Sequence, residues 1–499
     1  MSELYLTVDR IGNNICERYI GEDGTEHRRK VQYEPTLFVH TKTNTGFKDI
    51  YNNNCLPRKF NTMGDAGKWK RDNEEMVECL GMDDFQVAYI SDNYRTRIPD
   101  MSKVRVGNLD IEVPAPEFPD PMQARYEIKT VVHYDSLMDQ YHMFGIPVNG
   151  QQWIRSKSVI DPEVLAKVVY HECQNEKELL IQYLLFWREF TPVIVTGWNI
   201  ESFDMPYIGR RIERVLGEKA FKALSPWGKV GWQTTKDDFG NETQKLDITG
   251  VQELDYLALY RKFTFKPRPN FRLDYIGLVE VGQQKLSFEQ SNYLDFYNED
   301  YQRFCDYNCI DVHLVKRIDG RLLLLQLAVT LGYYAGINFG TVFGTLKPWD
   351  AIIFNSLRKD NKVVPMQRRC DKRPFIGAFV KDPTPGFYRD ILSFDFTSLY
   401  PSIICQCNIS PETIYEQFVG ELSLLDQIEA LVLQTFKLPH GDYSASANGM
   451  LYTKEFAGVI PVEITKVFLE RKEWKKKMLE AQREAELVKQ ELEKRGIKV

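Results

Sequence analysis

The chain has 499 residues, which is too long for a single hydrophobic core and predicts about two to four domains. Hydrophobic residues make up 43% and charged residues 27% of the sequence, a balance that is typical of folded globular proteins and excludes wholesale disorder. No run of eighteen apolar residues is present, so no membrane-spanning helix is expected. The net charge of −6 argues against a protein that coats nucleic acid by bulk charge, but it allows an enzyme with a local basic channel.

The nine cysteines are scattered along the chain and form no Cys-x-x-Cys pair. We therefore expect neither a disulfide scaffold nor a zinc site, and a reducing cytosol fits the pattern best. The first ten residues lack the basic start and the apolar block of a secretion signal.

Short apolar runs separated by turn residues predict a β-rich N-terminal domain. Strands are expected at Leu4–Val8, Thr36–Val39 and Phe85–Ile90, and a helix around Asp65–Leu80. The polar segment Asn93–Lys103 then predicts a domain boundary near residue 105.

From that boundary strands and helices alternate, which predicts an α/β sheet with a site at the strand ends. Strands are expected at Val104–Val113 and Val193–Gly197, and helices at Glu176–Phe190, Asp204–Val215 and Asp300–Leu331. The polar segment Trp232–Leu246 carries Asp-Asp-Phe-Gly-Asn at its centre and indicates a hairpin that projects from the body.

The last third of the chain begins with glycines at every fourth position, namely Gly332, Gly336, Gly340 and Gly344. Interior helix glycines cost ~1 kcal/mol each, so a loop with close-packed turns is favoured over a helix-packing stripe. After these glycines we expect four features: a boundary near Lys362–Arg373, a strand at Asp390–Asp395, a helical turn into Pro401–Ile404 and one long helix over Pro461–Arg495. Gly496 is the expected stop signal of that helix.

The strongest local signal is the sequence Asn-Leu-Asp-Ile-Glu-Val at residues 108–113. Side chains two residues apart on a strand point to the same face, so Asp110 and Glu112 would lie side by side. Two carboxylates this close raise each other's pKa unless a cation sits between them, and hard divalent ions bind such oxygens. Taken alone, the pair is more typical of two surface acids on a strand edge.

Two further patterns add carboxylates to this pair. Asp204 follows the expected strand Val193–Gly197 just where a helix begins, although an ordinary helix N-cap would also explain it. Tyr307 and Asp311 lie one helical turn apart, on one face. A phenol beside a metal-bound carboxylate can orient an attacking water.

In chain order, Asp-x-Glu, Asn-x3-Phe-Asp and Tyr-x3-Asp resemble the three motifs of the proofreading 3′→5′ exonucleases with a ribonuclease-H-like sheet. The resemblance implies two metal ions about 3.5–4 Å apart that stabilise the attacking and leaving oxygens of a phosphodiester. It implies that Asp110, Glu112 and Asp311 hold the first ion, that Asp110 and Asp204 serve the second, and that Tyr307 positions the hydroxide.

A further motif is Ser-Phe-Asp-Phe-Thr-Ser-Leu-Tyr-Pro-Ser-Ile at residues 393–403. An aspartate at the end of a strand, Asp395, can bind a triphosphate-bound magnesium, and the backbone N–H groups of Thr397–Tyr400 could cradle phosphate oxygens. A buried strand that ends in an aspartate cap is the alternative. The segment resembles motif A of the family-B DNA polymerases.

Beyond the motifs, residues 1 to about 495 resemble the N-terminal part of the family-B DNA polymerases of T-even-type bacteriophages. Supporting stretches are Gly81–Phe85, Thr196–Asn199, Trp349–Leu357 and Val462–Phe468. The resemblance implies that Asp395 and Phe396 belong to the polymerase metal site. It implies that the substrate-binding residues include Ser398, Leu399, Tyr400, Arg471 and Lys475. It also implies that Phe203 binds near the terminal bases of single-stranded DNA. For Arg471 and Lys475, one turn apart on a fingers helix, a solvated basic face is the plain alternative.

The resemblance also implies the architecture, an α/β multidomain protein. It implies an N-terminal domain at residues 1–105 completed by 324–366, a ribonuclease-H-like exonuclease domain at 106–323, a partial palm at 367–455 and the first half of the fingers at 456–499. The hairpin Trp232–Leu246 would help to separate the primer end from the template.

A family-B polymerase also needs an Asp-Thr-Asp cluster, a second fingers helix and a thumb, and no Asp-x-Asp occurs in this sequence. Asp395 by itself cannot hold two Mg²⁺ ions. We therefore expect the N-terminal subunit of a split replicative DNA polymerase, completed by a separate C-terminal chain. The apolar stripe over Ile464–Leu492 would pack on a helix of that chain. A shortened polymerase with exonuclease activity only is the alternative.

The expected cofactor is Mg²⁺, with Mn²⁺ as a possible substitute. The expected partners are primer–template and single-stranded DNA, dNTPs, the C-terminal chain and, through that chain, a replisome clamp, in the cytoplasm of the infected bacterial host. A hypothesis from a different class is a nucleic-acid-binding or assembly chain without catalysis. The presence of all four exonuclease carboxylates, Asp110, Glu112, Asp204 and Asp311, argues against it.

Overall fold

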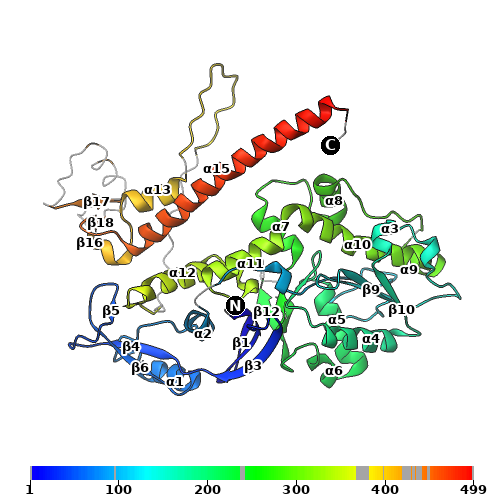
Figure 1. The fold of residues 1–499 in the computed structure, drawn as a ribbon, viewed down its shortest axis with the longest axis horizontal. Coiled ribbons are helices and arrows are strands. Elements are labelled where there is room, and N and C mark those ends of the chain that lie inside the picture. Colours follow the sequence, from blue (N-terminus) through cyan, green and yellow to red (C-terminus); the bar gives the residue numbers. More distant parts are fainter. Residues whose placement is uncertain are drawn as a thin grey trace. The chain divides into compact units, whose positions relative to one another are not determined.

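The computed structural model describes residues 3–94, 97–236, 242–290, 292–366, 381–396, 398–417, 429, 433, 441–446 and 450–496 (Figure 1). The chain divides into two compact units, one made of Met1–Leu37 and Pro57–Asn355 and the other of Phe38–Leu56 and Ser356–Val499. The exonuclease region expected from the sequence lies within the first unit, whereas the expected N-terminal domain is divided between the two units, and the domain boundaries stay a prediction. No helix in the described ranges is long and apolar enough to cross a membrane.

The first unit begins with a three-stranded antiparallel sheet in the order β1-β2-β3. Its strands are β1 (Leu4–Ile11), β2 (Asn14–Ile20) and β3 (Glu26–Gln32), and the same unit contains α1 (Met63–Asn73) and α2 (Phe85–Asn93). Between β3 and α1 the chain forms β4 (Thr36–His40), β5 (Lys48–Asp49) and β6 (Cys55–Lys59), and most of this stretch, Phe38–Leu56, belongs to the second unit. The predicted strands at Leu4–Val8 and Thr36–Val39 are thus confirmed, and the helix expected around Asp65–Leu80 begins at Met63 and ends at Asn73.

The predicted strand at Phe85–Ile90 is wrong, because these residues open helix α2. The Asp84 side chain accepts hydrogen bonds from the backbone N–H groups of Gln86 and Val87, which caps the helix. The helix is buried on nearly all sides, so its apolar run shows no helical period, and a short run of this kind cannot be told from a buried strand by pattern alone.

The core of the first unit is a six-stranded mixed sheet in the order β10-β9-β8-β7-β11-β14. Its strands are β7 (Val106–Glu112), β8 (Thr130–Asp135), β9 (Gln140–Gly145), β10 (Val168–Glu172), β11 (Ile194–Thr196) and β14 (Gln252–Glu253). Strand β7 is antiparallel to β8 and parallel to β11, so the end of β11 lies beside the middle of β7.

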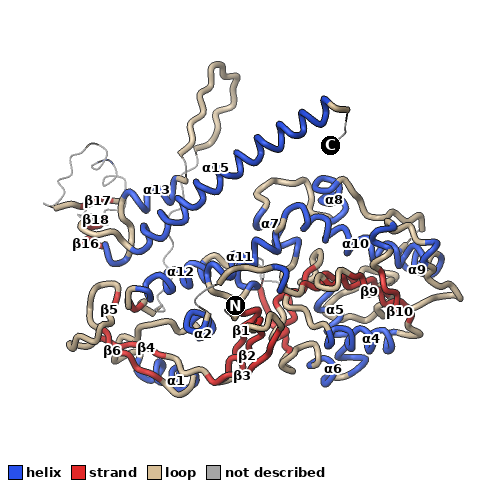
Figure 2. Tube along the Cα trace, viewed as in Figure 1, coloured by secondary structure: helices blue, strands red, loops and turns tan. Residues whose placement is uncertain are grey.

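Helices cover both faces of this sheet (Figures 1 and 2). On one face, α4 (Glu176–Glu189) and α5 (Asp204–Leu216) pack on residues such as Leu109, Ile111 and Phe144. On the other face, α10 (Tyr301–Leu322) packs on residues such as Val132 and Met143. The layered α/β sheet predicted from the alternation of elements is therefore present.

Smaller elements surround the sheet. They are α3 (Pro162–Leu165), α6 (Glu218–Lys222), α7 (Tyr256–Phe263), α8 (Leu273–Val281), α9 (Tyr293–Glu299) and the antiparallel strands β12 (Val230–Lys236) and β13 (Glu242–Ile248). Strands β12 and β13 confirm the hairpin predicted at Trp232–Leu246, whose centre lies outside the described residues.

The long helical stretch expected at Asp300–Leu331 is divided in two, because Leu323 is left-handed with a φ of +55°. The second helix, α11 (Leu324–Ala335), returns to strand β1, where the Tyr5 hydroxyl donates to the Gly332 and Ile337 carbonyls. Gly336 ends α11 with a φ of +76°, which confirms the expected turn there, whereas the loop expected at Gly332 is wrong because this glycine is buried inside α11, close to the Phe339 ring. These contacts attach α11 to the N-terminal sheet, while the completion of the N-terminal domain by residues 324–366 stays a prediction.

The second unit is built around a three-stranded sheet and a long helix. Its elements in the described ranges include α13 (Leu399–Gln406), β15 (Lys362–Val363), β16 (Ile414–Gln417), β17 (Tyr443–Ala445), β18 (Met450–Thr453) and α15 (Val459–Lys494); α12 (Leu346–Lys359) runs across the division between the units. Helix α15 confirms the single helix predicted over Pro461–Arg495, and Gly496 follows it with a φ of +73°.

The strand predicted at Asp390–Asp395 is absent, and the described residues 381–396 run as an exposed coil. Phe394 is 88% exposed, and Asp390 is left-handed with a φ of +54°. A strand needs a hydrogen-bonded neighbour, and none of the strand pairs in the described ranges includes these residues. The predicted strand therefore lacks the hydrogen-bonded neighbour that it would need.

Candidate active site

A group of three carboxylates lies where β7 meets α10. Asp110 and Glu112 lie on the same face of β7, and Asp311 comes from α10, which packs on that face. One carboxylate oxygen from each lies within 4.8 Å of the others, and within the described residues this is the one such group. The structure thus brings together residues that are about 200 positions apart in the chain, as the order of the motifs predicts.

Asp204 joins the group from the first turn of α5. Its Oδ1 accepts a hydrogen bond of 3.1 Å from the backbone N–H of Ile111, the residue between Asp110 and Glu112. The carboxylate therefore reaches toward β7 and is held next to the pair on that strand.

Burial and mutual repulsion raise the pKa values of these carboxylates. Burial, followed by the charges of Asp204, Glu112 and Asp311, raises the pKa of Asp110 well above its usual range. Burial raises the pKa of Glu112 to about 8, that of Asp204 to about 7 and that of Asp311 to about 6, and for Glu112 the charge of Asp311 adds to the effect. Without a cation, these groups therefore resist being ionised together.

The donor set fits a hard divalent cation. The ligand atoms are carboxylate oxygens, which Mg²⁺ and Mn²⁺ prefer, and Asp311 Oδ1 is buried with no hydrogen-bond partner among the described residues. An orphaned buried carboxylate oxygen is costly unless a cation satisfies it. Asp110, Glu112 and Asp311 are therefore the residues suited to hold a metal, with Asp204 alongside.

A lysine that sequence reasoning missed, Lys285, lies within this group. Its ammonium forms an ion pair with Asp311 and donates a 2.9 Å hydrogen bond to the hydroxyl of Tyr307. Burial works to lower the pKa of Lys285, but nearby charges, with Asp311 foremost, raise it well above its usual range. The backbone N–H of Lys285 donates to Asp274 at the start of α8, which fixes the segment at the site.

Two more residues that sequence reasoning missed orient the carboxylates. Asn308 Nδ2 donates a 2.6 Å hydrogen bond to Asp110, while Asn308 Oδ1 accepts one from the Thr130 hydroxyl. The hydroxyl of Tyr293, at the start of α9, hydrogen-bonds to Glu112. Asn308 follows Tyr307 directly in the sequence, so an amide beside the motif was the available signal, whereas Tyr293 had none.

Aromatic rings flank the start of α5. Phe203 lies against Phe118, with ring centroids 5.7 Å apart, and against Tyr207 at 5.4 Å. Phe118 is itself 83% exposed, so one ring of the group faces solvent. The sequence predicted Phe203 but not Phe118.

The residues predicted for nucleotidyl transfer lie in the second unit, and in the described ranges Asp395 belongs to no group of three or more potential metal ligands. Asp395 and Phe396 are exposed in the coil before α13, and Thr397 lies outside the described residues. Ser398 precedes α13 with a φ of +52°, and Leu399 and Tyr400 open that helix. Arg471 and Lys475 are exposed, one turn apart, on α15.

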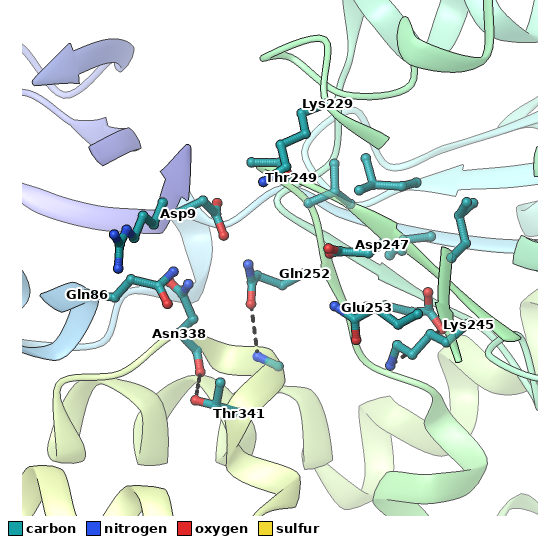
Figure 3. A pocket seen from close by; sticks show the side chains of 17 residues that line it. Asp9, Gln86, Lys229, Lys245, Asp247, Thr249, Gln252, Glu253, Asn338 and Thr341 are labelled. Atoms are coloured by element: carbon teal, nitrogen blue, oxygen red, sulfur yellow. Dashed lines mark hydrogen bonds and ion pairs between the residues drawn. The ribbon is translucent and has the colours of Figure 1, made fainter. Parts of the chain in front are cut away.

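A polar cavity of about 360 Å³ lies elsewhere in the first unit, between β1 and the base of the β12–β13 hairpin (Figure 3). Asp9 and Asp247 face it, and burial together with the Asp247 charge raises the pKa of Asp9 to about 7. Asp9 also accepts a hydrogen bond from the Gly250 N–H, and Arg18 donates to the Gly250 carbonyl. Buried polar contacts thus hold the hairpin base on the N-terminal sheet.

The fold and the carboxylate group define a class of protein. Residues 103–276 match the profile described as "DNA polymerase family B, exonuclease domain", and residues 349–499 match that of "DNA polymerase family B". Together they cover more than half of the chain, which belongs to DNA polymerase family B.

Particular relatives follow from the full sequence. The chain is 43% identical to the DNA-directed DNA polymerase of Escherichia phage RB69, over 100% of this chain and 56% of that protein. It is 43% identical to the DNA-directed DNA polymerase of Enterobacteria phage T4, over 98% of this chain and 55% of that protein. The DNA polymerase delta catalytic subunit of Schizosaccharomyces pombe is 25% identical over 75% of this chain. The predicted resemblance to phage family-B polymerases is confirmed, and the chain spans about half the length of the phage relatives it matches.

Proposed function

We propose that the first unit is a divalent-metal-dependent 3′→5′ exonuclease that removes nucleotides from single-stranded DNA ends, within a replicative DNA-directed DNA polymerase. The observation that carries this proposal is the largely buried group of Asp110, Glu112 and Asp311, with Asp204 held beside it by a hydrogen bond from the Ile111 N–H. Glu112, Asp204 and Asp311 are buried and Asp110 is partly buried, and carboxylates gathered in this way destabilise a fold unless they bind cations. The match to a family-B exonuclease domain supports the same conclusion.

The side chains divide the work of phosphodiester hydrolysis. One Mg²⁺ would be held by Asp110, Glu112 and Asp311, and a second by Asp110 and Asp204. When bound, the two ions would stabilise the attacking and leaving oxygens. The Tyr307 hydroxyl accepts a hydrogen bond from Lys285, so its own proton is free to be donated elsewhere and can orient the attacking water. The Lys285 ammonium adds positive charge where the phosphate develops negative charge.

Aromatic stacking would hold the end of the strand. The exposed Phe118 ring and the neighbouring Phe203 ring offer π faces at the start of α5, and bases of any sequence can stack on such faces. The β12–β13 hairpin would keep the primer end apart from the template strand, as in the sequence-based expectation.

The exonuclease proposal is tested by incubating the chain with a 3′ single-stranded oligonucleotide and Mg²⁺. We expect stepwise release of mononucleotides, which EDTA abolishes and Mn²⁺ in place of Mg²⁺ restores. Asp110→Asn should reduce the rate by several orders of magnitude, while Asp72→Asn, at an exposed site on α1, should not change it. Binding without any release by the wild-type chain would favour a non-catalytic nucleic-acid-binding chain.

We further propose that the second unit supplies half of the nucleotidyl-transfer site. Asp395 and Phe396 would contact the polymerase metals. The incoming dNTP would be bound by Ser398, Leu399 and Tyr400, and its triphosphate by Arg471 and Lys475. The sequence contains no Asp-x-Asp. In this proposal a separate C-terminal chain supplies the remaining carboxylates and also carries the clamp contact.

Exposed apolar side chains support such a partner. Trp474, Met478 and Val488 on α15, and Ile391 and Leu392 in the coil before α13, are largely exposed. Mixing this chain with a purified polypeptide that carries the Asp-Thr-Asp motif and the thumb should give co-elution and primer extension. A mixture that neither co-elutes nor extends a primer would refute the split arrangement and leave the exonuclease proposal untouched.

A further inference from the structure

Phe265, in the loop between α7 and α8, combines two unfavourable features. Its backbone is left-handed, with a φ of +51°, a conformation that is an outlier for a bulky side chain. Its ring is 88% exposed, so it also forgoes the stabilisation that burial would give. Strain and exposure at one residue indicate a role outside the fold itself.

The loop around Phe265 is held firmly at both sides. Before it, the Thr264 hydroxyl donates to the Tyr260 carbonyl, and after it Arg268 donates to the Tyr260 hydroxyl and pairs with Glu280. At the far end the Phe271 carbonyl accepts a hydrogen bond from the Trp198 indole. Proline at positions 267 and 269 restricts the backbone between these anchors. The Phe265 ring is therefore presented by a fixed loop.

The charges of the loop are all of one sign. Residues 264–273 contain Lys266, Arg268 and Arg272 and no acidic residue, in a chain whose net charge is −6. Arg268 is used within the loop, whereas Lys266 and Arg272 are exposed and make no ion pair in the described part of the chain. An exposed ring beside unpaired cations is the combination that binds single-stranded nucleic acid through base stacking and phosphate contacts.

The loop borders the carboxylate group. Trp198, which anchors Phe271, follows strand β11, the parallel neighbour of β7 that carries Asp110 and Glu112. Asp274, two residues after Arg272, accepts the backbone hydrogen bond of Lys285, whose ammonium lies against Asp311.

We propose that Phe265 and Lys266 form a platform for the single strand outside the cleavage site, where the ring stacks on a nucleobase and Lys266 and Arg272 neutralise phosphates. This rests on the proposed exonuclease function, because it places the 3′ end of the same strand at the carboxylates. A surface that binds a protein partner has contiguous apolar side chains at its centre. The exposed neighbours of Phe265 are instead charged, proline or asparagine residues.

The platform is tested by fluorescence anisotropy of a labelled 12-nucleotide single strand in EDTA, where no hydrolysis occurs. Phe265→Ala should weaken binding about tenfold, and Phe265→Trp should restore it, because stacking on an aromatic face is the interaction removed. Phe265→Asn, which tolerates the left-handed backbone, should behave like Phe265→Ala. Lys266→Ala should reduce the slope of log K against log salt by about 0.7. Met76→Ala, 78% exposed before α2, is the matched control and should bind as wild type.

Substrate length separates this proposal from the exonuclease proposal. Phe265→Ala should slow cleavage of a 12-mer at low concentration and leave cleavage of a trinucleotide unchanged. Equal loss on both substrates, or no loss of 12-mer binding, would overturn the platform while wild-type cleavage still supports the exonuclease. Intact DNA binding by Phe265→Ala with loss of co-elution with a C-terminal polymerase chain would also overturn it, in favour of a protein contact. A wild-type chain that neither binds nor cleaves would instead refute the proposed function.

Discussion

Replacing Asp204 by asparagine should stabilise the metal-free protein. Burial raises the pKa of Asp204 from 3.8 to about 7 in the folded chain. A carboxylate whose pKa is raised by folding does not lower the free energy of unfolding below its unfolded pKa. The free energy of unfolding then falls as the pH rises, and the loss is complete above the folded pKa. At 1.36 kcal/mol for each pKa unit, the shift corresponds to about 4 kcal/mol at pH 8. Asparagine keeps an oxygen for the Ile111 N–H, so most of this cost should be removed.

The assay is thermal unfolding of wild type and Asp204→Asn at pH 8 and at pH 4, each in EDTA and in Mg²⁺. In EDTA at pH 8 the variant should melt several degrees higher, and at pH 4, near the unfolded pKa, the difference should nearly disappear. Mg²⁺ should raise the melting temperature of the wild type more than that of the variant, because it binds the folded carboxylates. A variant that melts below the wild type in EDTA at pH 8 would refute the reasoning.

Three further changes test other parts of the fold. Lys285→Met should reduce the exonuclease rate about 100-fold with little change in DNA binding in EDTA, as measured by single-turnover cleavage and anisotropy; an unchanged rate would exclude Lys285 from the chemistry. Burial lowers the pKa of His133 from 6.5 to about 3, so the neutral ring stabilises the fold fully above pH 6.5, and the free energy of unfolding should fall by about 2 kcal/mol by pH 5. Urea unfolding of His133→Gln should show a free energy that changes less with pH over this range. Gly332→Ala places a Cβ 2.7 Å from the buried Phe339 ring and should cost about 1–3 kcal/mol in urea, whereas Gly320→Ala, with open space around it, should cost nothing.

The carboxylates of the site could be predicted because each lies in a local pattern that fixes its direction. The alternation of β7 places Asp110 and Glu112 on one face, and a helical turn relates Tyr307 to Asp311. Asp204 was placed at the end of a strand, and strand ends meet at one edge of a sheet. In each case a short stretch of sequence determines where the side chain points, and the motif order supplies the rest.

Lys285, Tyr293 and Asn308 could not be placed in the same way. Lys285 lies outside any helix or strand, so no period relates it to Asp311, and it reaches the site only because Asp274 holds its backbone. Tyr293 bonds to Glu112 across the packing of α9 against α10, a contact between elements. Such contacts depend on how elements pack, which local patterns do not encode.

The two misassigned segments failed for opposite reasons. Phe85–Ile90 was read as a strand because burial on nearly every side removes the helical period, although the capping residue Asp84 was visible in the sequence. Asp390–Asp395 carries the apolar residues of a short strand but has no paired neighbour in the described ranges. Pattern therefore specifies the capacity to form a strand, while the hydrogen-bonded partner decides whether it forms.

The acidic balance of the chain bears on how a polyanion can approach the site. Asp110, Glu112, Asp204 and Asp311 would repel a phosphodiester if they were ionised and bare. Burial is the main cause of their raised pKa values, and for Asp110 and Glu112 the neighbouring carboxylates add to it. Within the site Lys285 offsets part of this charge. Outside it the acid-free loop of residues 264–273 offers cations to the strand. DNA affinity in EDTA should therefore depend on the loop, whereas cleavage should depend on the metal. Added salt should accordingly weaken the binding of single-stranded DNA in EDTA. Replacing EDTA by Mg²⁺ should restore cleavage, but it should not restore the DNA affinity that is lost to salt.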